Sequence, residues 1–168
     1  MAPGDLGRVA DPVALDPDWP ARYRDDPRWG PAMTRPPGLL DPGVLGSERW
    51  RTTPFPAVGL HASARGLATF YGHLFDGTVE ALLGAELHRE YVGPQAVGHD
   101  LLLDRQVTWT LGLQRDDLDI GMGGAGGCTA WWSFRGRYAA AFVSRGLGSH
   151  DRGDAVYDLL EERYRSRP

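Results

Sequence analysis

The sequence contains no lysine, because all 18 of its basic residues are arginine. This absence bears directly on a glycine-rich stretch at residues 120–132, IGMGGAGGCTAWW. A phosphate-binding loop of the Walker type needs a lysine after its glycines and a helix that begins there. The residues after Gly127 are instead β-formers such as Thr129 and Trp131. The stretch is therefore interpreted as a strand and not as a nucleotide-binding loop.

Cysteine, excess positive charge and long apolar runs are also scarce. The single cysteine, Cys128, excludes an internal disulfide and a cysteine-based zinc site. The net charge of −4 gives no electrostatic basis for binding nucleic acid or an anionic membrane. No apolar run approaches the roughly 20 residues of a membrane span, and the first residues lack the pattern of a secretory signal. We therefore expect a cytoplasmic protein that uses neither a metal nor a cofactor.

The remaining composition is that of a globular domain. The chain has 168 residues, of which 42% are hydrophobic and 24% are charged. We expect one module, residues 1–168, with an irregular Pro- and Trp-rich wrap over 1–59 and regular structure over 60–168. The three tryptophans of the wrap argue against disorder, because a solvated segment gains nothing from large aromatic side chains.

The pattern after residue 60 predicts an α+β fold, in which helices pack on an antiparallel sheet. Ser63 is a good N-cap for a helix with apolar residues at helical spacing. Asp116–Asp119 predicts a turn, and Arg135-Gly136 predicts the connection of a hairpin. The expected helices cover residues 63–75, 80–88 and 152–164, and the expected strands cover residues 106–114, 120–134 and 137–144.

Three residues on or near the glycine-rich strand are interpreted either as structural residues or as residues that line a pocket. Trp131 and Trp132 point to opposite faces of a strand, so one is expected under the terminal helix, while the other is core, lines a pocket or covers an edge. His61 precedes the Ser63 cap and is either structural or part of the pocket wall. The glycines themselves would let a ligand or another backbone approach the strand closely.

Several segments resemble the C-terminal half of the serine β-lactamase-like family. The resemblance is closest to the class C β-lactamase-related esterases and the penicillin-binding-protein-like hydrolases, and it covers almost the whole chain. The segments that carry it are GLHASARGLATFYGHLFDG, GHDLLLDRQVTWTLGL and IGMGGAGGCTAWWSFRGRYAAAFVSRGLGSHD, with weaker counterparts in GRVADP and LLDPGVLGSERWRTTPFPAVGLHASARG.

The resemblance implies an acyl-transfer site. Family members use a Ser-x-x-Lys motif, a Tyr-x-Asn or Ser-x-Asn motif, and a third motif of Lys or His, a small residue and Gly on the strand that lines the pocket. Met122-Gly123-Gly124 matches the third motif. Ala125 matches the position whose backbone N–H faces the oxyanion.

The sequence also departs from this family pattern. Ser-x-x-Lys is impossible without lysine, and the thioether of Met122 can neither carry a proton nor bind a carboxylate. Three functions follow: an ester or amide hydrolase completed by another polypeptide, a non-catalytic protein that binds a small molecule or a protein, or a small-molecule enzyme that reuses the old cleft. We expect either a homodimer or a complex with a complementary N-terminal half.

Overall fold

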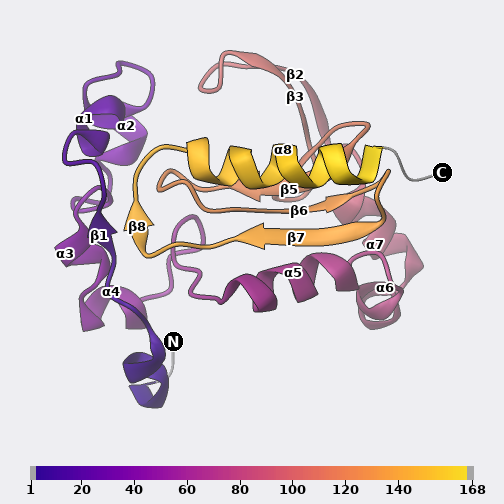
Figure 1. Cartoon of the computed structure of the whole chain (residues 1–168), viewed down its shortest axis with the longest axis horizontal. Coiled ribbons are helices and arrows are strands. Elements are labelled where there is room, and N and C mark those ends of the chain that lie inside the picture. The colour runs from indigo at the N-terminus through magenta and orange to yellow at the C-terminus, as the bar shows by residue number, and fades with distance from the viewer. Residues whose placement is uncertain (1–2, 166–168) are drawn as a thin grey trace. The chain divides into compact units, whose positions relative to one another are not determined.

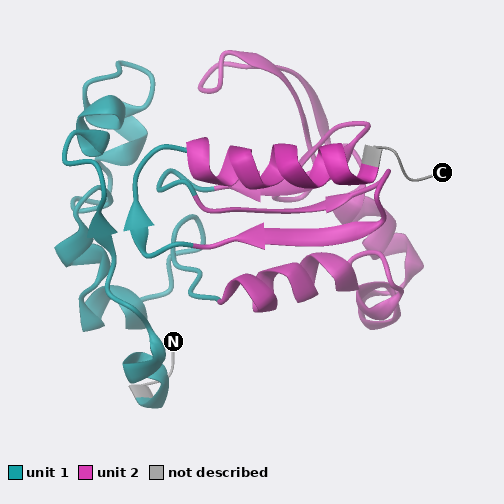
Figure 2. Cartoon of the chain, viewed as in Figure 1, with its two compact units in different colours: residues 1–62, 124–127, 144–150 teal, residues 63–123, 128–143, 151–168 magenta. Residues whose placement is uncertain are grey.

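The computed structural model describes residues 3–165 and divides the chain into two units (Figure 2). The first unit comprises the N-terminal part up to Ala62 and two short segments, 124–127 and 144–150. The second unit comprises 63–123, 128–143 and the C-terminal part from Asp151. The short segments join the first unit although each lies between elements of the second.

A six-stranded antiparallel sheet forms the centre of the second unit (Figure 1). The strands follow one another in sequence order across the sheet, so the topology is a simple meander. They are β2 (Ala96–Asp100), β3 (Arg105–Trp109), β4 (Gln114–Arg115), β5 (Asp119–Gly123), β6 (Thr129–Ser133) and β7 (Tyr138–Phe142). This arrangement confirms the predicted α+β class.

Helices cover both faces of the sheet, and adjacent tryptophans of β6 identify the two faces. Trp131 packs on Tyr157 of α8 (Asp151–Arg165), with ring centroids 5.2 Å apart. Trp132 stacks on Phe75, which follows α5 (Ala64–His73), with centroids 5.3 Å apart. Because successive side chains of a strand point to opposite faces, α5 and α8 lie on opposite sides. The prediction of a tryptophan under the terminal helix is confirmed.

The core lies between α5 and the sheet. Its side chains come from both layers, and two of them, Leu74 and Ile120, are completely buried. The buried members are Tyr71, Leu74, Val92, Leu113, Ile120 and Ala130.

The predicted helix over 63–75 is confirmed, whereas the predicted helix over 80–88 is wrong. The structure has two short helices there, α6 (Thr78–Leu83) and α7 (Ala85–Val92). Gly84 separates them, since its φ of +83° is not a helical conformation. Apolar spacing continues across this glycine, which is why the sequence pattern suggested a continuous helix.

Two of the predicted strands also divide in the structure. The segment 106–114 is interrupted by a turn at 110–113, where the Thr110 N–H donates to the Leu113 carbonyl at 2.8 Å. The segment 120–134 is two strands, β5 and β6, joined through residues 124–127. Gly124 and Ala125 therefore lie in a turn and not on the predicted pocket strand. Strand β2 was not predicted.

The first unit consists of short elements. They are a 3-10 helix (Pro3–Arg8), β1 (Val13–Ala14), α1 (Trp19–Arg24), α2 (Gly30–Met33), α3 (Pro42–Leu45), α4 (Glu48–Thr52) and β8 (Gly146–Leu147). Strands β1 and β8 pair in parallel, with Val13 opposite Gly146.

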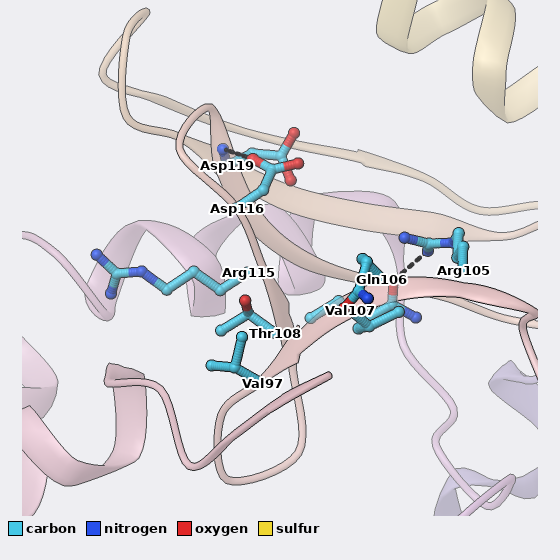
Figure 3. A pocket seen from close by; sticks show the side chains of 9 residues that line it. Val97, Arg105, Gln106, Val107, Thr108, Arg115, Asp116 and Asp119 are labelled. Carbon is cyan, nitrogen blue, oxygen red and sulfur yellow. Dashed lines mark hydrogen bonds between the residues drawn. The ribbon is translucent and has the colours of Figure 1, made fainter. Parts of the chain in front are cut away.

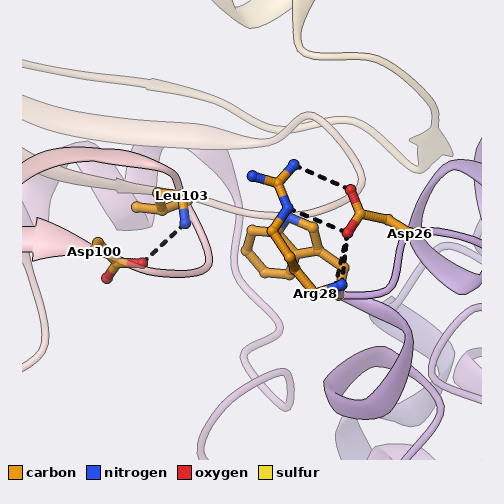
Figure 4. A network of polar contacts seen from close by, with 5 residues as sticks. Asp26, Arg28, Asp100 and Leu103 are labelled. Carbon is orange, nitrogen blue, oxygen red and sulfur yellow. Dashed lines mark hydrogen bonds and ion pairs between the residues drawn. The ribbon is translucent and has the colours of Figure 1, made fainter.

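Local side-chain contacts stabilise the turns of this unit. Asp26 accepts hydrogen bonds from the backbone N–H groups of Arg28 and Trp29 and forms an ion pair with the Arg28 guanidinium (Figure 4). The Arg28 hydrogen bonds lower the pKa of Asp26 from its usual value. In the second unit, Asp100 similarly accepts a hydrogen bond from the Leu103 N–H at the tip of the β2–β3 hairpin.

Replacement of Ser63 by alanine is expected to reduce the free energy of unfolding by about 1 kcal/mol. The Ser63 hydroxyl accepts a hydrogen bond from the Gly66 N–H at 3.1 Å and so caps α5. Urea denaturation of Ser63→Ala and Ser63→Asp measures the effect, because aspartate retains a capping oxygen. If both variants were equally destabilised, the loss would not come from the cap.

Candidate functional site

The segment that matches the family's third motif lies where β5 ends. Met122 and Gly123 are the exposed last residues of β5, and the chain then enters a turn formed by Gly124–Gly127, here called the glycine turn. The Gly127 N–H donates to the Gly124 carbonyl at 2.8 Å, and the φ of Gly127 is +87°. These features are those of a glycine-dependent turn.

The chain's own residues approach several of these glycines closely. A Cβ on Gly121 would lie 2.5 Å from the Ala130 carbonyl oxygen on the adjacent strand. At Gly126, a Cβ would lie 2.5 Å from the Leu147 side chain, and at Gly127 it would overlap the Ser149 carbonyl oxygen. The glycines at 121, 126 and 127 are thus required by packing within the chain.

Three successive carbonyl oxygens of the glycine turn accept hydrogen bonds from other residues of the first unit, to which the turn itself belongs. The Gly124 oxygen lies 3.1 Å from Nε2 of His150, and the Ala125 oxygen accepts a bond from the Tyr23 hydroxyl at 2.9 Å. The Gly126 oxygen accepts a bond from the Gly148 N–H at 3.2 Å. These contacts fix the orientation of the peptide groups around Ala125.

The contacts of the other predicted site residues are made outside this turn. Trp131 is buried in the packing of α8, and Trp132 is partly buried against Phe75. His61 has its Nδ1 3.1 Å from the Gly59 carbonyl oxygen, in the loop before α5. Their role as pocket residues stays a prediction.

A polar hollow of about 360 Å³ lies on the second unit, over strands β2 to β5 (Figure 3). None of the predicted site residues lines it. The lining residues are Val97, Arg105, Gln106, Val107, Thr108, Gln114, Arg115, Asp116 and Asp119.

The charged groups of this hollow already have partners within the chain. Arg105 donates to the Gln114 side-chain oxygen at 2.6 Å, and Arg115 donates to the Val92 carbonyl at 2.7 Å. Asp116 accepts from two backbone N–H groups of its own turn, as expected for the predicted Asp116–Asp119 turn. The charged groups of the hollow are therefore held by contacts within the chain and do not form a set directed at one ligand.

Two acidic side chains anchor α8 to the sheet. Asp119 accepts a hydrogen bond from the Tyr157 hydroxyl at 2.6 Å. Glu161, which is only 7% exposed, accepts bonds from the hydroxyls of Ser133 at 3.1 Å and Tyr138 at 2.9 Å. Burial and the hydrogen bond to Glu161 raise the pKa of Tyr138 to about 12, so this phenol remains a donor at neutral pH.

The Asp119 carboxyl is expected to weaken the fold at neutral pH relative to acidic pH. Burial raises its pKa above 3.8, and the nearby Asp116 and Glu161 add to this rise, although the Tyr157 hydrogen bond opposes it. The folded chain therefore binds this proton at a higher pH than the unfolded chain does. The contribution of this group to the free energy of unfolding thus falls as pH rises from 3.8 through the folded pKa.

Comparison of the wild type with Asp119→Asn tests this pH dependence, because asparagine keeps an oxygen for Tyr157 and has no charge. Urea denaturation at pH 4 and pH 7 should show the variant gaining stability relative to the wild type as pH rises. If the stability of the variant relative to the wild type were instead greater at pH 4 than at pH 7, the pKa of Asp119 would not be raised in the folded chain.

Two histidines, His99 and His150, are each followed by an aspartate in the sequence, but neither pairs with that aspartate in the structure. Nε2 of His99 lies 3.1 Å from a carboxylate oxygen of Asp104, and Nε2 of His150 contacts the Gly124 carbonyl. Among the described residues, no group of three His, Cys, Asp or Glu side chains is placed to hold a metal ion. In the same part of the chain, no helix has the length and apolarity needed to cross a membrane.

Tyr23 and His150 are the residues that sequence reasoning missed. Tyr23 lies in the irregular wrap, 102 residues before its partner Ala125, so no local pattern connects them. The aromatic spacing of Trp19, Tyr23 and Trp29 was a usable signal, because their rings pack edge to face in the structure.

Comparisons with known proteins support the fold. No protein-family model matches the sequence, and no curated protein matches it. The structure is similar to the crystal structure of a family VIII carboxylesterase, with a TM-score of 0.64 and 20% sequence identity. The match covers 89% of this chain and 41% of the carboxylesterase chain. The chain therefore has the α+β fold of a β-lactamase-like half-domain and spans less than half of that enzyme.

Proposed function

We propose that this chain supplies one wall of a β-lactamase-like serine hydrolase that cleaves esters or amides. The extent of the structural match carries the proposal. Nearly all of this chain corresponds to 41% of a carboxylesterase, so more than half of that enzyme has no counterpart here. We place the nucleophile, in a Ser-x-x-Lys motif, in that remaining part of the hydrolase.

In this proposal the glycine turn stabilises the transition state. The serine hydroxyl gives its proton to the lysine of the same motif as its oxygen attacks the substrate carbonyl carbon, and the carbonyl oxygen takes up the negative charge. The backbone N–H of Ala125 donates to this oxygen, together with the N–H of the nucleophilic serine. Removal of one such donor typically lowers kcat about 100- to 1,000-fold.

The edge of the sheet provides a place for the completing polypeptide. Among the described residues, β7 pairs with β6 on one side only, so its other backbone edge can accept a strand. We propose a complementary N-terminal half as the partner, with a homodimer as the second possibility. The protein would act in the cytoplasm on a small-molecule substrate.

A non-catalytic binding protein is the second candidate function, and Met122 is the observation that favours it. This side chain is 41% exposed at the position where the family has Lys or His, and it has no acid–base chemistry. Reuse of the cleft by other acid–base groups has less support, because the titratable groups that contact the glycine turn, Tyr23 and His150, bind its carbonyl oxygens.

The chain alone is expected to hydrolyse p-nitrophenyl butyrate no faster than the uncatalysed background. It should also remain unlabelled by a fluorophosphonate probe, because both require the missing nucleophile. Co-expression with the product of an adjacent reading frame that carries Ser-x-x-Lys should restore hydrolysis and yield a stable complex by light scattering.

The control is the same complex with the Ser-x-x-Lys serine changed to alanine, which should bind normally and hydrolyse nothing. Labelling of the isolated chain would overturn the placement of the nucleophile. A stable complex without hydrolysis would favour the non-catalytic function, and a monomer that binds no such partner would contradict the proposed completion.

A further inference from the structure

The side chains of Tyr23 and His150 contact two successive carbonyl oxygens of the glycine turn. His150 contacts the Gly124 carbonyl oxygen at 3.1 Å, and the Tyr23 hydroxyl donates to the Ala125 carbonyl oxygen at 2.9 Å. A peptide group is planar, and in its trans form the C=O and the following N–H point in opposite directions. Fixing the Gly124 carbonyl therefore orients the Ala125 N–H, and fixing the Ala125 carbonyl orients the Gly126 N–H.

The two oriented N–H groups have no acceptor within residues 3–165. Both residues are partly exposed. Successive backbone N–H groups in a turn conformation can form a concavity that binds anions. The next N–H in the turn, that of Gly127, is occupied by the Gly124 carbonyl oxygen and does not take part.

Tyr23 is well placed to hold its carbonyl in one position. Its ring packs edge to face between Trp19, which is 2% exposed, and Trp29, with centroids 5.9 and 6.1 Å away. Burial raises the pKa of the Tyr23 phenol, although the nearby Arg22 opposes this, so the hydroxyl keeps its proton at neutral pH. His150 donates from Nε2 as the imidazolium or as the neutral tautomer with a proton on Nε2.

We propose that Tyr23 and His150 are positioning residues that present the N–H groups of Ala125 and Gly126 as a paired donor site for an anionic oxygen. The identity of that oxygen as the oxyanion of an acyl-transfer intermediate rests on the proposed function. The donor site itself should bind any small tetrahedral oxyanion. Neither side chain touches the substrate, since each acts through the peptide group that it holds.

Titration of the full ¹⁵N-labelled chain with methylphosphonate tests the donor site without any need for activity. The amide signals of Ala125 and Gly126 should shift and saturate. Tyr23→Phe removes only the hydroxyl and should weaken binding about five-fold, the size expected for one lost hydrogen bond. His150→Ala should weaken binding similarly, and His150→Gln, which can still donate to the Gly124 carbonyl, should restore it.

Tyr91→Phe is the matched control, because the hydroxyl of Tyr91 makes no hydrogen bond within residues 3–165. It should bind methylphosphonate like the wild type, and the dispersed amide spectrum of each variant shows whether it is folded. Unchanged affinity in folded Tyr23→Phe and His150→Ala, or no shift at Ala125 and Gly126, would overturn the proposal.

The same variants separate this inference from the proposed function. In the completed enzyme, Tyr23→Phe should lower kcat and leave KM unchanged, because the donors act on charge that develops in the transition state. Phosphonate binding that depends on Tyr23, in a complex that hydrolyses nothing, would reject the proposed hydrolase and retain the donor site.

Discussion

The free energy of unfolding of the Gly127→Ala variant is expected to be about 3 kcal/mol lower than that of the wild type. Two effects combine at this position. The φ of +87° is unfavourable for a residue with a side chain, and a Cβ would overlap the Ser149 carbonyl oxygen, which belongs to the backbone and cannot move aside easily. Thermal or urea denaturation measures the loss.

Gly77→Ala is the matched control for this variant. Gly77 has a nearly identical φ of +91°, but a Cβ there would have no atom within 4 Å. Its replacement should cost only about 1 kcal/mol, the conformational part of the effect. Equal losses in the two variants would show that Ser149 does not restrict the glycine turn.

The Glu161→Ala variant is expected to lose about 3 kcal/mol of stability. It removes the acceptor of two hydroxyl groups, Ser133 and Tyr138, and the first of these is completely buried. A buried hydroxyl without a partner retains the cost of its desolvation and gains nothing in return. The loss should appear as weaker packing of α8 on the sheet.

Two further variants isolate the hydrogen bonds from the loss of side-chain volume. Glu161→Gln keeps one acceptor oxygen and should lose less stability than Glu161→Ala. Glu162→Ala removes an exposed neighbour on the same helix and should change stability by about 0.5 kcal/mol or less. If Glu161→Ala resembled Glu162→Ala, the buried network would contribute little to the attachment of α8.

The parts of the fold that the sequence predicted well are those determined by local signals. Ser63 and the apolar spacing after it identified α5, and Arg135-Gly136 identified the hairpin between β6 and β7. The alternation of Trp131 and Trp132 predicted a sheet with packing on two faces, which α8 and Phe75 provide. In each case the determining residues lie within a few positions of one another.

The errors arose where one residue overrides a longer pattern or where the cause is distant. Gly84 and Gly112 adopt positive φ values and break segments whose apolar spacing appeared continuous. Strand β2 is almost entirely exposed, so it lacks the alternation that reveals a half-buried strand. The contacts of Tyr23 and His150 with the glycine turn come from tertiary structure and leave no local pattern.

The parallel pairing of β1 with β8 has a consequence for the order of folding. Strand β1 ends at Ala14, and its partner begins only at Gly146, so this pairing closes most of the chain into one long loop. Tyr23 and Ala125 are likewise separated by 102 positions. Contacts between such distant residues require a large loss of chain entropy before they contribute stability. During synthesis on the ribosome, the hairpin of β5 and β6 can therefore form before the glycine turn between them acquires its contact with Tyr23.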